Sequence, residues 1–212
     1  MNEKGPSMKL AIFGATGGTG RPLLEQALAA GHDVTVLVRT PASVSLQHER
    51  LRVVQGDVRQ ADQVAAVISG QDAVLSVLGP QERGPVDLCT TAMTNILAAM
   101  ERHGVRRLIA LSAYGARESH GGGLYNMLLW RMRKEKMVDK ERMEALIARS
   151  AADWTVVRPP MLTNGPRTAR YHTGIGLRMR VTSRIARADV ADFMLRQVAD
   201  TAYVRMSPAI AA

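Results

Sequence analysis

The sequence predicts an α/β fold, in which one doubly wound parallel sheet carries helices on both faces. Two observations predict it. Short apolar runs alternate with amphipathic segments along the 212 residues. The first apolar run leads directly into a glycine-rich turn, Gly14-Ala-Thr-Gly-Gly-Thr-Gly20. A chain of this length is expected to form a single domain with a full core, which we place at residues 8–212, with 1–7 as a leader or a disordered segment.

The individual elements follow from periodicity and turn signals. Each expected strand is a mostly apolar run that ends on turn-forming residues, and these runs are 9–13, 34–38, 51–55, 73–78, 107–111, 154–157 and 203–206. Each expected helix carries apolar residues at helical spacing, and these segments are 22–31, 61–68, 86–103, 137–149 and 185–197. Residues 161–180 show little periodicity, so they are expected to form a small C-terminal loop region that covers a substrate.

Composition narrows the class of protein. The formal net charge is +9, but the arginines are scattered and mostly alternate with acids, so a basic mouth for an anionic small molecule is a better explanation than nucleic-acid binding. No apolar run reaches the roughly 18 residues of a membrane span. The lone cysteine, Cys89, is expected in the core and fits a cytoplasmic location. No metal site is expected, because the histidines, Cys89 and the acids lack ligand spacing.

The glycine-rich turn indicates a dinucleotide site. After a strand, such a turn directs backbone N–H groups and a helix N-terminus at a diphosphate. Gly14 would allow the tight turn, Gly17 the close approach of the phosphates, and Gly20 the packing of helix on strand. The spacing is G-x-x-G-x-x-G, one residue longer than the most familiar fingerprint. The expected binding loop is completed by Thr16, Gly18 and Thr19.

The end of the second strand predicts which dinucleotide binds. NAD-binding domains carry an acid there that holds the ribose 2′-hydroxyl, whereas this chain has Arg39 and Thr40. A guanidinium pairs with the 2′-phosphate of NADP(H). The sequence therefore predicts NADP(H) as the cofactor.

Ligands of a doubly wound sheet lie beyond the carboxyl ends of its strands. Asp57 is placed to reach the adenine amino group, although turn chemistry explains Gly56-Asp57 equally well. The other residues expected to bind the cofactor at these strand ends are Val58, Gly79, Ser112 and Pro159.

Several stretches resemble the atypical short-chain dehydrogenase/reductases, and among them the NADPH-dependent flavin and biliverdin-IXβ reductases. They are Ala11-Ile-Phe-Gly-Ala-Thr-Gly-Gly-Thr-Gly20, Val34-Thr-Val-Leu-Val-Arg39, Trp154-Thr-Val-Val-Arg-Pro-Pro160 and the run at 187–195. The resemblance implies a single-domain Rossmann-like fold, NADPH, and hydride transfer to a flat conjugated acceptor. Met161 follows the paired prolines where those relatives commonly carry a histidine, which argues against biliverdin itself.

The proton relay of ordinary short-chain dehydrogenases is absent. That relay pairs a tyrosine with a lysine four residues later, and no Tyr-x-x-x-Lys occurs in this chain. Lys140 stands where the lysine would fall, but Lys136 occupies the tyrosine's place. The remaining catalytic candidates are Ser112, Tyr114 and Lys140, with Tyr171 and His172 on the covering loop; each also has an ordinary structural explanation as a cap, a packed loop residue or a surface group.

The sequence thus predicts an NADPH-dependent oxidoreductase that reduces a conjugated small molecule, such as a flavin or a quinone. The substrate is expected to be planar or aromatic, and the protein a monomer or small homo-oligomer. Two alternatives stay open. One is a non-catalytic NADP(H)-binding redox sensor, which loss of the relay favours slightly. The other is a tailoring enzyme of a biosynthetic pathway.

Overall fold

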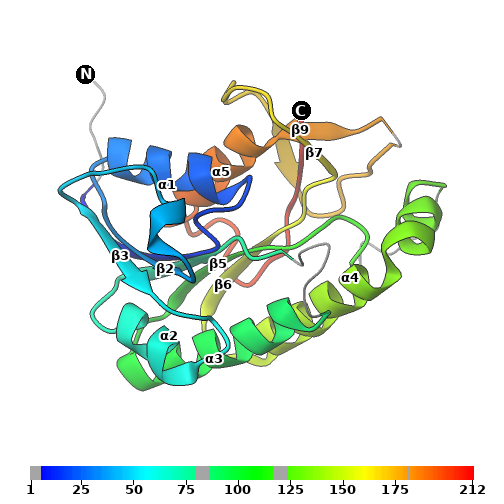
Figure 1. Ribbon diagram of the computed structural model, residues 1–212. Helices are drawn as coiled ribbons and strands as arrows, with labels where there is room; N and C mark the ends of the chain where they lie inside the picture. The colour runs from blue at the N-terminus through cyan, green and yellow to red at the C-terminus, as the bar shows by residue number, and fades with distance from the viewer. Residues whose placement is uncertain (1–5, 80–85, 117–123, 181) are drawn as a thin grey trace.

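The central sheet has the strand order of a doubly wound nucleotide-binding domain. The computed structural model describes residues 6–79, 86–116, 124–180 and 182–212 (Figure 1). Six parallel strands lie in the order β3-β2-β1-β4-β5-β6. Their bounds are β1 Lys9–Phe13, β2 Asp33–Val38, β3 Leu51–Gln55, β4 Ala73–Ser76, β5 Arg107–Leu111 and β6 Asp153–Val157. The predicted α/β architecture is confirmed, and these six strands lie within two residues of their predicted limits.

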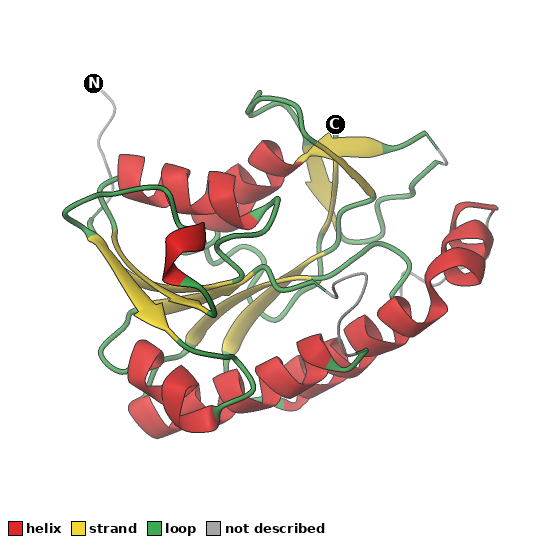
Figure 2. Ribbon diagram, viewed as in Figure 1, coloured by secondary structure: helices red, strands yellow, loops and turns green. Residues whose placement is uncertain are grey.

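Helices cover both faces of this sheet (Figure 2). On one face lie α1 (Gly20–Ala29) and α5 (Arg187–Arg196), and on the other lie α2 (Ala61–Ile68), α3 (Leu88–His103) and α4 (Leu124–Arg149). A short 3-10 turn, η1 (Pro41–Ser43), follows β2. Alternate residues of β1 enter opposite cores, with Ile12 beneath α1 and α5 and Phe13 beneath α2 and α3. The sheet is therefore buried on both faces, as the apolar strand sequences predict.

The helix α4 is longer than the sequence indicated. A helix was expected at 137–149, whereas α4 begins at Leu124 and has a kink at Arg133 (φ −138°, ψ 31°). The added segment is rich in Leu, Met, Arg, Lys and Glu, which are strong helix formers, but the kink breaks the phase of its apolar positions. The glycine run at 121–123 lies outside the described residues.

The C-terminal region is more ordered than the expected loop. Within 161–180, β7 (Met161–Thr163) pairs in parallel with β9 (Arg184–Ala186), and β8 (His172–Gly174) pairs with β10 (Ala209–Ala211) in antiparallel. The expected helix at 185–197 therefore starts at Arg187. The predicted strand at 203–206 is wrong, because this segment is a turn apart from one isolated bridge at Met206. Three-residue strands with distant partners carry too little periodicity to be found locally.

Candidate nucleotide-binding site

The glycine-rich loop lies where the strand order reverses. β1 has β2 on one side and β4 on the other, and the chain enters α1 beyond the carboxyl end of β1. In open α/β sheets a ligand binds in the crevice at this switch point. The residues expected to bind the cofactor thus share one edge of the sheet, because they follow the carboxyl ends of the strands β1 to β6.

The loop from Gly14 to Gly20 is tightly folded. Gly14 has a φ of +90°, and a Cβ there would lie 3.0 Å from the backbone carbon and oxygen of Val77, just after β4. The Gly17 amide donates to the Gly14 carbonyl over 3.0 Å. A Cβ on Gly20 would stand 2.0 Å from the same Gly14 oxygen. Gly14 and Gly20 are therefore required by the folded chain itself.

The start of α1 is suited to an anion. Its N-cap residue, Thr19, makes no side-chain capping bond, and the first turn contains no acidic residue. In the part of the chain that the structure describes, the amides of Gly18, Thr19 and Gly20 have no protein acceptor. Unpaired N–H groups and the helix dipole together favour a phosphate at this position.

Arg39 lies directly after β2 and is exposed. Among the described residues it forms no ion pair and no hydrogen bond, and η1 begins two residues later. No acid stands at this strand end, so the local charge is positive. This arrangement suits the 2′-phosphate of NADP(H), because the guanidinium can pair with it and no neighbouring carboxylate among the described residues repels it.

Asp57 takes part in turn chemistry. Its Oδ1 accepts the Arg59 amide at 3.0 Å, and its own amide donates to Gln63 Oε1 at 2.7 Å. The next residue, Val58, packs against the core, and its carbonyl accepts from the Asn95 amide group at 2.9 Å. These turn contacts account for Asp57 without a ligand, and its contact with the adenine amino group stays a prediction. Gly79, after β4, is exposed, with open space where a Cβ would be.

The ends of β5 and β6 bring Ser112, Tyr114 and Pro159 together. The Ser112 amide donates to the Val157 carbonyl at 2.8 Å, and the Tyr114 amide to the Pro159 carbonyl at 2.8 Å. Ser112 is 6% exposed, and its hydroxyl is buried with no hydrogen-bond partner in the described structure. The phenol of Tyr114 accepts from the Met179 amide at 3.4 Å, so it faces the C-terminal segment 161–180.

Lys140 is not a surface cation. It is 7% exposed, and its Nζ donates to the Leu78 carbonyl at 2.8 Å and to the Leu111 carbonyl at 2.6 Å. These carbonyls follow β4 and end β5, so the ammonium ties together two strand ends at the site. Sequence reasoning could not separate this placement from a solvated helix lysine, because the acceptors are backbone atoms.

Asp139, the residue before Lys140, binds the N-terminus of α3. Asp139 accepts the amides of Cys89 and Thr90 at 2.9 Å each, which caps the N-terminus of α3 from α4. Cys89 is 1% exposed, which confirms the expected core position. Burial raises the pKa of its thiol, and Lys140 opposes that shift in part.

A family model described as NAD(P)H-binding matches residues 14–201. The chain belongs to this NAD(P)H-binding family. The match includes the glycine-rich loop, Arg39, every strand end described above and α5. It confirms the expected resemblance and the NAD(P)H class of cofactor.

Curated relatives of this NAD(P)H-binding protein include reductases. Reductase pytE of Aspergillus terreus is 28% identical over 240 residues, which cover 89% of this chain and 90% of that protein. Cinnamoyl-CoA reductase 1 of Oryza sativa is 30% identical over 54% of this chain, and a chloroplastic protein of Arabidopsis thaliana, At2g34460, is 28% identical over 76%. The chain spans 61% of the length of the Arabidopsis protein and 37% of the rice reductase.

Solved structures share the fold. The oxidoreductase ylbE of Lactococcus lactis superposes with a TM-score of 0.83 at 21% identity, over 96% of this chain and 90% of that one. A wide-type short-chain dehydrogenase/reductase of Veillonella parvula in complex with NADP gives 0.81 at 19%, over 98% and 95%. ChuY of Escherichia coli, an anaerobilin reductase, gives 0.80 at 22%, over 95% and 96%. These likenesses confirm the Rossmann-like fold.

In the NAD(P)H-binding protein the C-terminal segment 161–180 is anchored to α5. Asp189 accepts the amides of Thr168 and Ala169 at 2.7 and 2.8 Å, and Asp192 accepts the Tyr171 phenol at 2.6 Å. Burial and the Asp192 carboxylate raise the pKa of Tyr171 far above its usual value. This phenol therefore stays protonated and bound to Asp192. His172, the other candidate on this region, is exposed.

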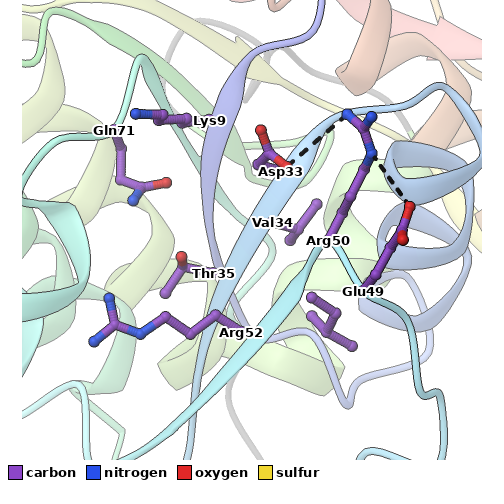
Figure 3. Close-up of a pocket in the computed structure, with 9 residues that line it drawn as sticks. Lys9, Asp33, Val34, Thr35, Glu49, Arg50, Arg52 and Gln71 are labelled. Carbon is purple, nitrogen blue, oxygen red and sulfur yellow. Dashed lines mark ion pairs between the residues drawn. The ribbon is translucent and has the colours of Figure 1, made fainter.

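A polar cavity of about 240 Å³ lies elsewhere (Figure 3). It is lined at the amino ends of the first strands by residues such as Lys9, Asp33 and Arg52. Arg50, one of its lining residues, lies between Asp33 at 3.9 Å and Glu49 at 4.0 Å. This edge is opposite the glycine-rich loop, so the cavity is separate from the nucleotide site. Within the described residues there is no group of metal-binding side chains and no helix able to cross a membrane.

Replacing Lys140 with methionine is expected to loosen the two strand ends. The change leaves the carbonyls of Leu78 and Leu111 without their shared donor, which costs about 2 kcal/mol and lowers the melting temperature by roughly 4–8 °C. Thermal unfolding without nucleotide measures the effect. Lys134→Met, on the exposed part of α4, is the matched control. Equal melting temperatures for the two variants would contradict the assignment.

Proposed function

We propose that this protein is an NADPH-dependent reductase that delivers hydride to a planar, conjugated small molecule, such as a flavin or a quinone. The observation that carries the proposal is the Ser112 hydroxyl. It is buried and has no partner in the described structure, at the end of β5 and on the same edge as the glycine-rich loop. A buried hydroxyl left without a hydrogen bond is costly, so a ligand that supplies one is favoured at this position.

The remaining polar residues of the site bind and orient. NADPH, when bound, supplies the hydride. The loop amides and Arg39 would hold its phosphates, and Ser112 Oγ would donate to a carbonyl of the acceptor or of the nicotinamide. Lys140 already donates to two backbone carbonyls, and no tyrosine stands one helix turn before it. A flavin or quinone suits this site, because such an acceptor can take its proton from solvent.

The sensor alternative shares the nucleotide site and differs only in chemistry. Lys140 favours the sensor alternative. Its ammonium group donates to the Leu111 carbonyl and, among the described residues, forms no proton relay with a tyrosine. The tailoring-enzyme alternative is a choice of acceptor within the reductase proposal. We also propose that the protein is cytoplasmic, because its lone cysteine, Cys89, is buried and unpaired. We propose that residues 8–212 form one domain and that the protein is a monomer or small homo-oligomer.

NADPH oxidation against a panel of flavins, quinones and enones tests the proposal. We expect turnover with at least one of them, and Ser112→Ala to lower kcat about tenfold through loss of orientation. Tyr114→Phe and Lys140→Ala should each cost less than the roughly hundredfold of a general acid, and kcat should vary little between about pH 6 and 8.

Ser150→Ala is the matched control, because its hydroxyl donates to Ile147 at the end of α4, away from the site. Tight NADPH binding without reduction of any acceptor would favour the sensor. Near-complete loss of activity in Tyr114→Phe would instead reveal a dedicated proton donor.

A further inference from the structure

The first residue of α5 reaches the glycine-rich loop. Arg187 Nε lies 2.8 Å, and its Cδ 2.9 Å, from the position that a Cβ on Gly18 would occupy. Gly18 is not one of the three glycines of the G-x-x-G-x-x-G spacing, and the turn does not require it, because no backbone atom crowds its missing side chain. A side chain at position 18 would therefore displace the side chain of Arg187.

The two edges of the Arg187 guanidinium are in different states. Nη1 donates to Asn164 Oδ1 at 2.6 Å and to the Leu162 carbonyl at 3.4 Å. Nε and Nη2 have no acceptor among the described residues, and Nε is the nitrogen that lies against Gly18. One edge is thus anchored, while the other keeps the donor fork that binds phosphate oxygens in pairs.

The charge of Arg187 is also uncompensated. Both of its acceptors are neutral, and among the described residues no carboxylate lies within ion-pair distance of it. The acids of α5 are engaged elsewhere, since Asp189 binds the backbone at 168–169 and Asp192 binds Arg167, Tyr171 and Arg196. A guanidinium in this state, beside unpaired amides at a helix N-terminus, is arranged for an anion.

We propose that Arg187 binds the diphosphate of the coenzyme, together with the amides of Gly18 and its neighbours. Asn164 is then a positioning residue, because it holds the Nη1 edge and turns the Nε–Nη2 edge toward the loop. Asn164 directly follows β7, so its contact with Arg187 joins the diphosphate to the start of the C-terminal segment 161–180. The inference rests on the nucleotide part of the proposed function and is independent of the acceptor.

Binding measurements with three nucleotides test this role. In Arg187→Met, NADPH and NADH should both bind about tenfold more weakly, because both contain the diphosphate. Adenosine 2′-monophosphate lacks the diphosphate, so its affinity should be unchanged. Arg187→Lys keeps the charge but not the fork, and should fall between the wild type and Arg187→Met. Calorimetry at fixed ionic strength measures each affinity.

Arg184→Met is the matched control, since among the described residues the side chain of this exposed arginine of β9 makes one hydrogen bond, at 3.4 Å to the Thr182 carbonyl. Gly18→Ala should reproduce the Arg187→Met pattern, because its methyl group displaces the guanidinium. Asn164→Ala leaves Arg187 in place and should weaken both dinucleotides by a few-fold, which keeps a test available if Arg187→Met does not fold. The proposal is overturned if Arg187→Met binds NADPH normally or if adenosine 2′-monophosphate weakens equally. Loss of dinucleotide affinity in a protein that reduces no acceptor would uphold Arg187 and count against the reductase alone.

Discussion

Replacing Arg39 with alanine is expected to weaken NADPH binding ten- to a hundredfold and to leave NADH binding nearly unchanged. The side chain follows β2, is exposed and has no partner among the described residues, so its removal costs the fold little. A charge-assisted bidentate contact to the 2′-phosphate is worth about 1.5–3 kcal/mol, which sets the size of the loss. NADH has no such phosphate and loses nothing.

Calorimetric titration with both coenzymes measures this selectivity. Arg52→Ala serves as the control, because it also removes one positive charge but lies in β3 and lines the cavity at the opposite edge. If Arg39→Ala weakened both coenzymes equally, the residue would act on a shared part of the nucleotide and the NADPH preference would need another source. Together with the Arg187 measurements, these titrations separate the 2′-phosphate contact from the diphosphate contact.

The parts of the molecule that sequence reasoning located are those with local causes. The apolar strands, the turn from Gly14 to Gly20 and the cation at Arg39 each lie within a few residues of the feature that explains them. Their positions in the chain therefore predict their positions at the sheet edge, since the carboxyl ends of parallel strands share one side. The cofactor class follows from the same local patterns.

The parts that sequence reasoning missed depend on distant partners. Strands β8 and β10 are three residues long and exist because they pair with each other across a long stretch of chain. Lys140 differs from any helix lysine only through two backbone carbonyls beyond β4 and at the end of β5. Arg187 meets Gly18 only after α1 and α5 pack on one face. Gly18 was expected only as part of the binding loop, and nothing local in the sequence indicates its contact with Arg187.

Substitutions in the glycine-rich loop are expected to separate effects on stability from effects on NADPH binding. Gly20→Ala places a methyl carbon 2.0 Å from the Gly14 oxygen and 2.7 Å from the Ala15 Cα, so the turn must move. Backbone atoms cannot rotate away as a side chain can, and we expect a loss of about 2–4 kcal/mol in the free energy of unfolding together with loss of NADPH binding.

Gly17→Ala is expected to behave differently. Its added carbon would meet only the Gly14 oxygen, at 3.2 Å, so the protein without nucleotide should melt within a few degrees of the wild type. The methyl group would nevertheless stand where the backbone approaches the diphosphate, and NADPH affinity should fall about a hundredfold. Thermal unfolding and calorimetry on the same samples measure both quantities.

The control for this pair is Gly174→Ala in β8, where nothing lies within 4 Å of the added carbon and neither stability nor binding should change. Normal NADPH affinity in Gly17→Ala would place the diphosphate away from this loop. A wild-type melting temperature in Gly20→Ala would mean that the turn can adopt another backbone conformation, in which the methyl group fits without loss of stability. We therefore expect Gly174→Ala to be unaffected, Gly17→Ala to be defective only in NADPH binding, and Gly20→Ala to be defective in both binding and stability. The added methyl group meets open space at Gly174, the expected ligand at Gly17, and the backbone of the turn at Gly20.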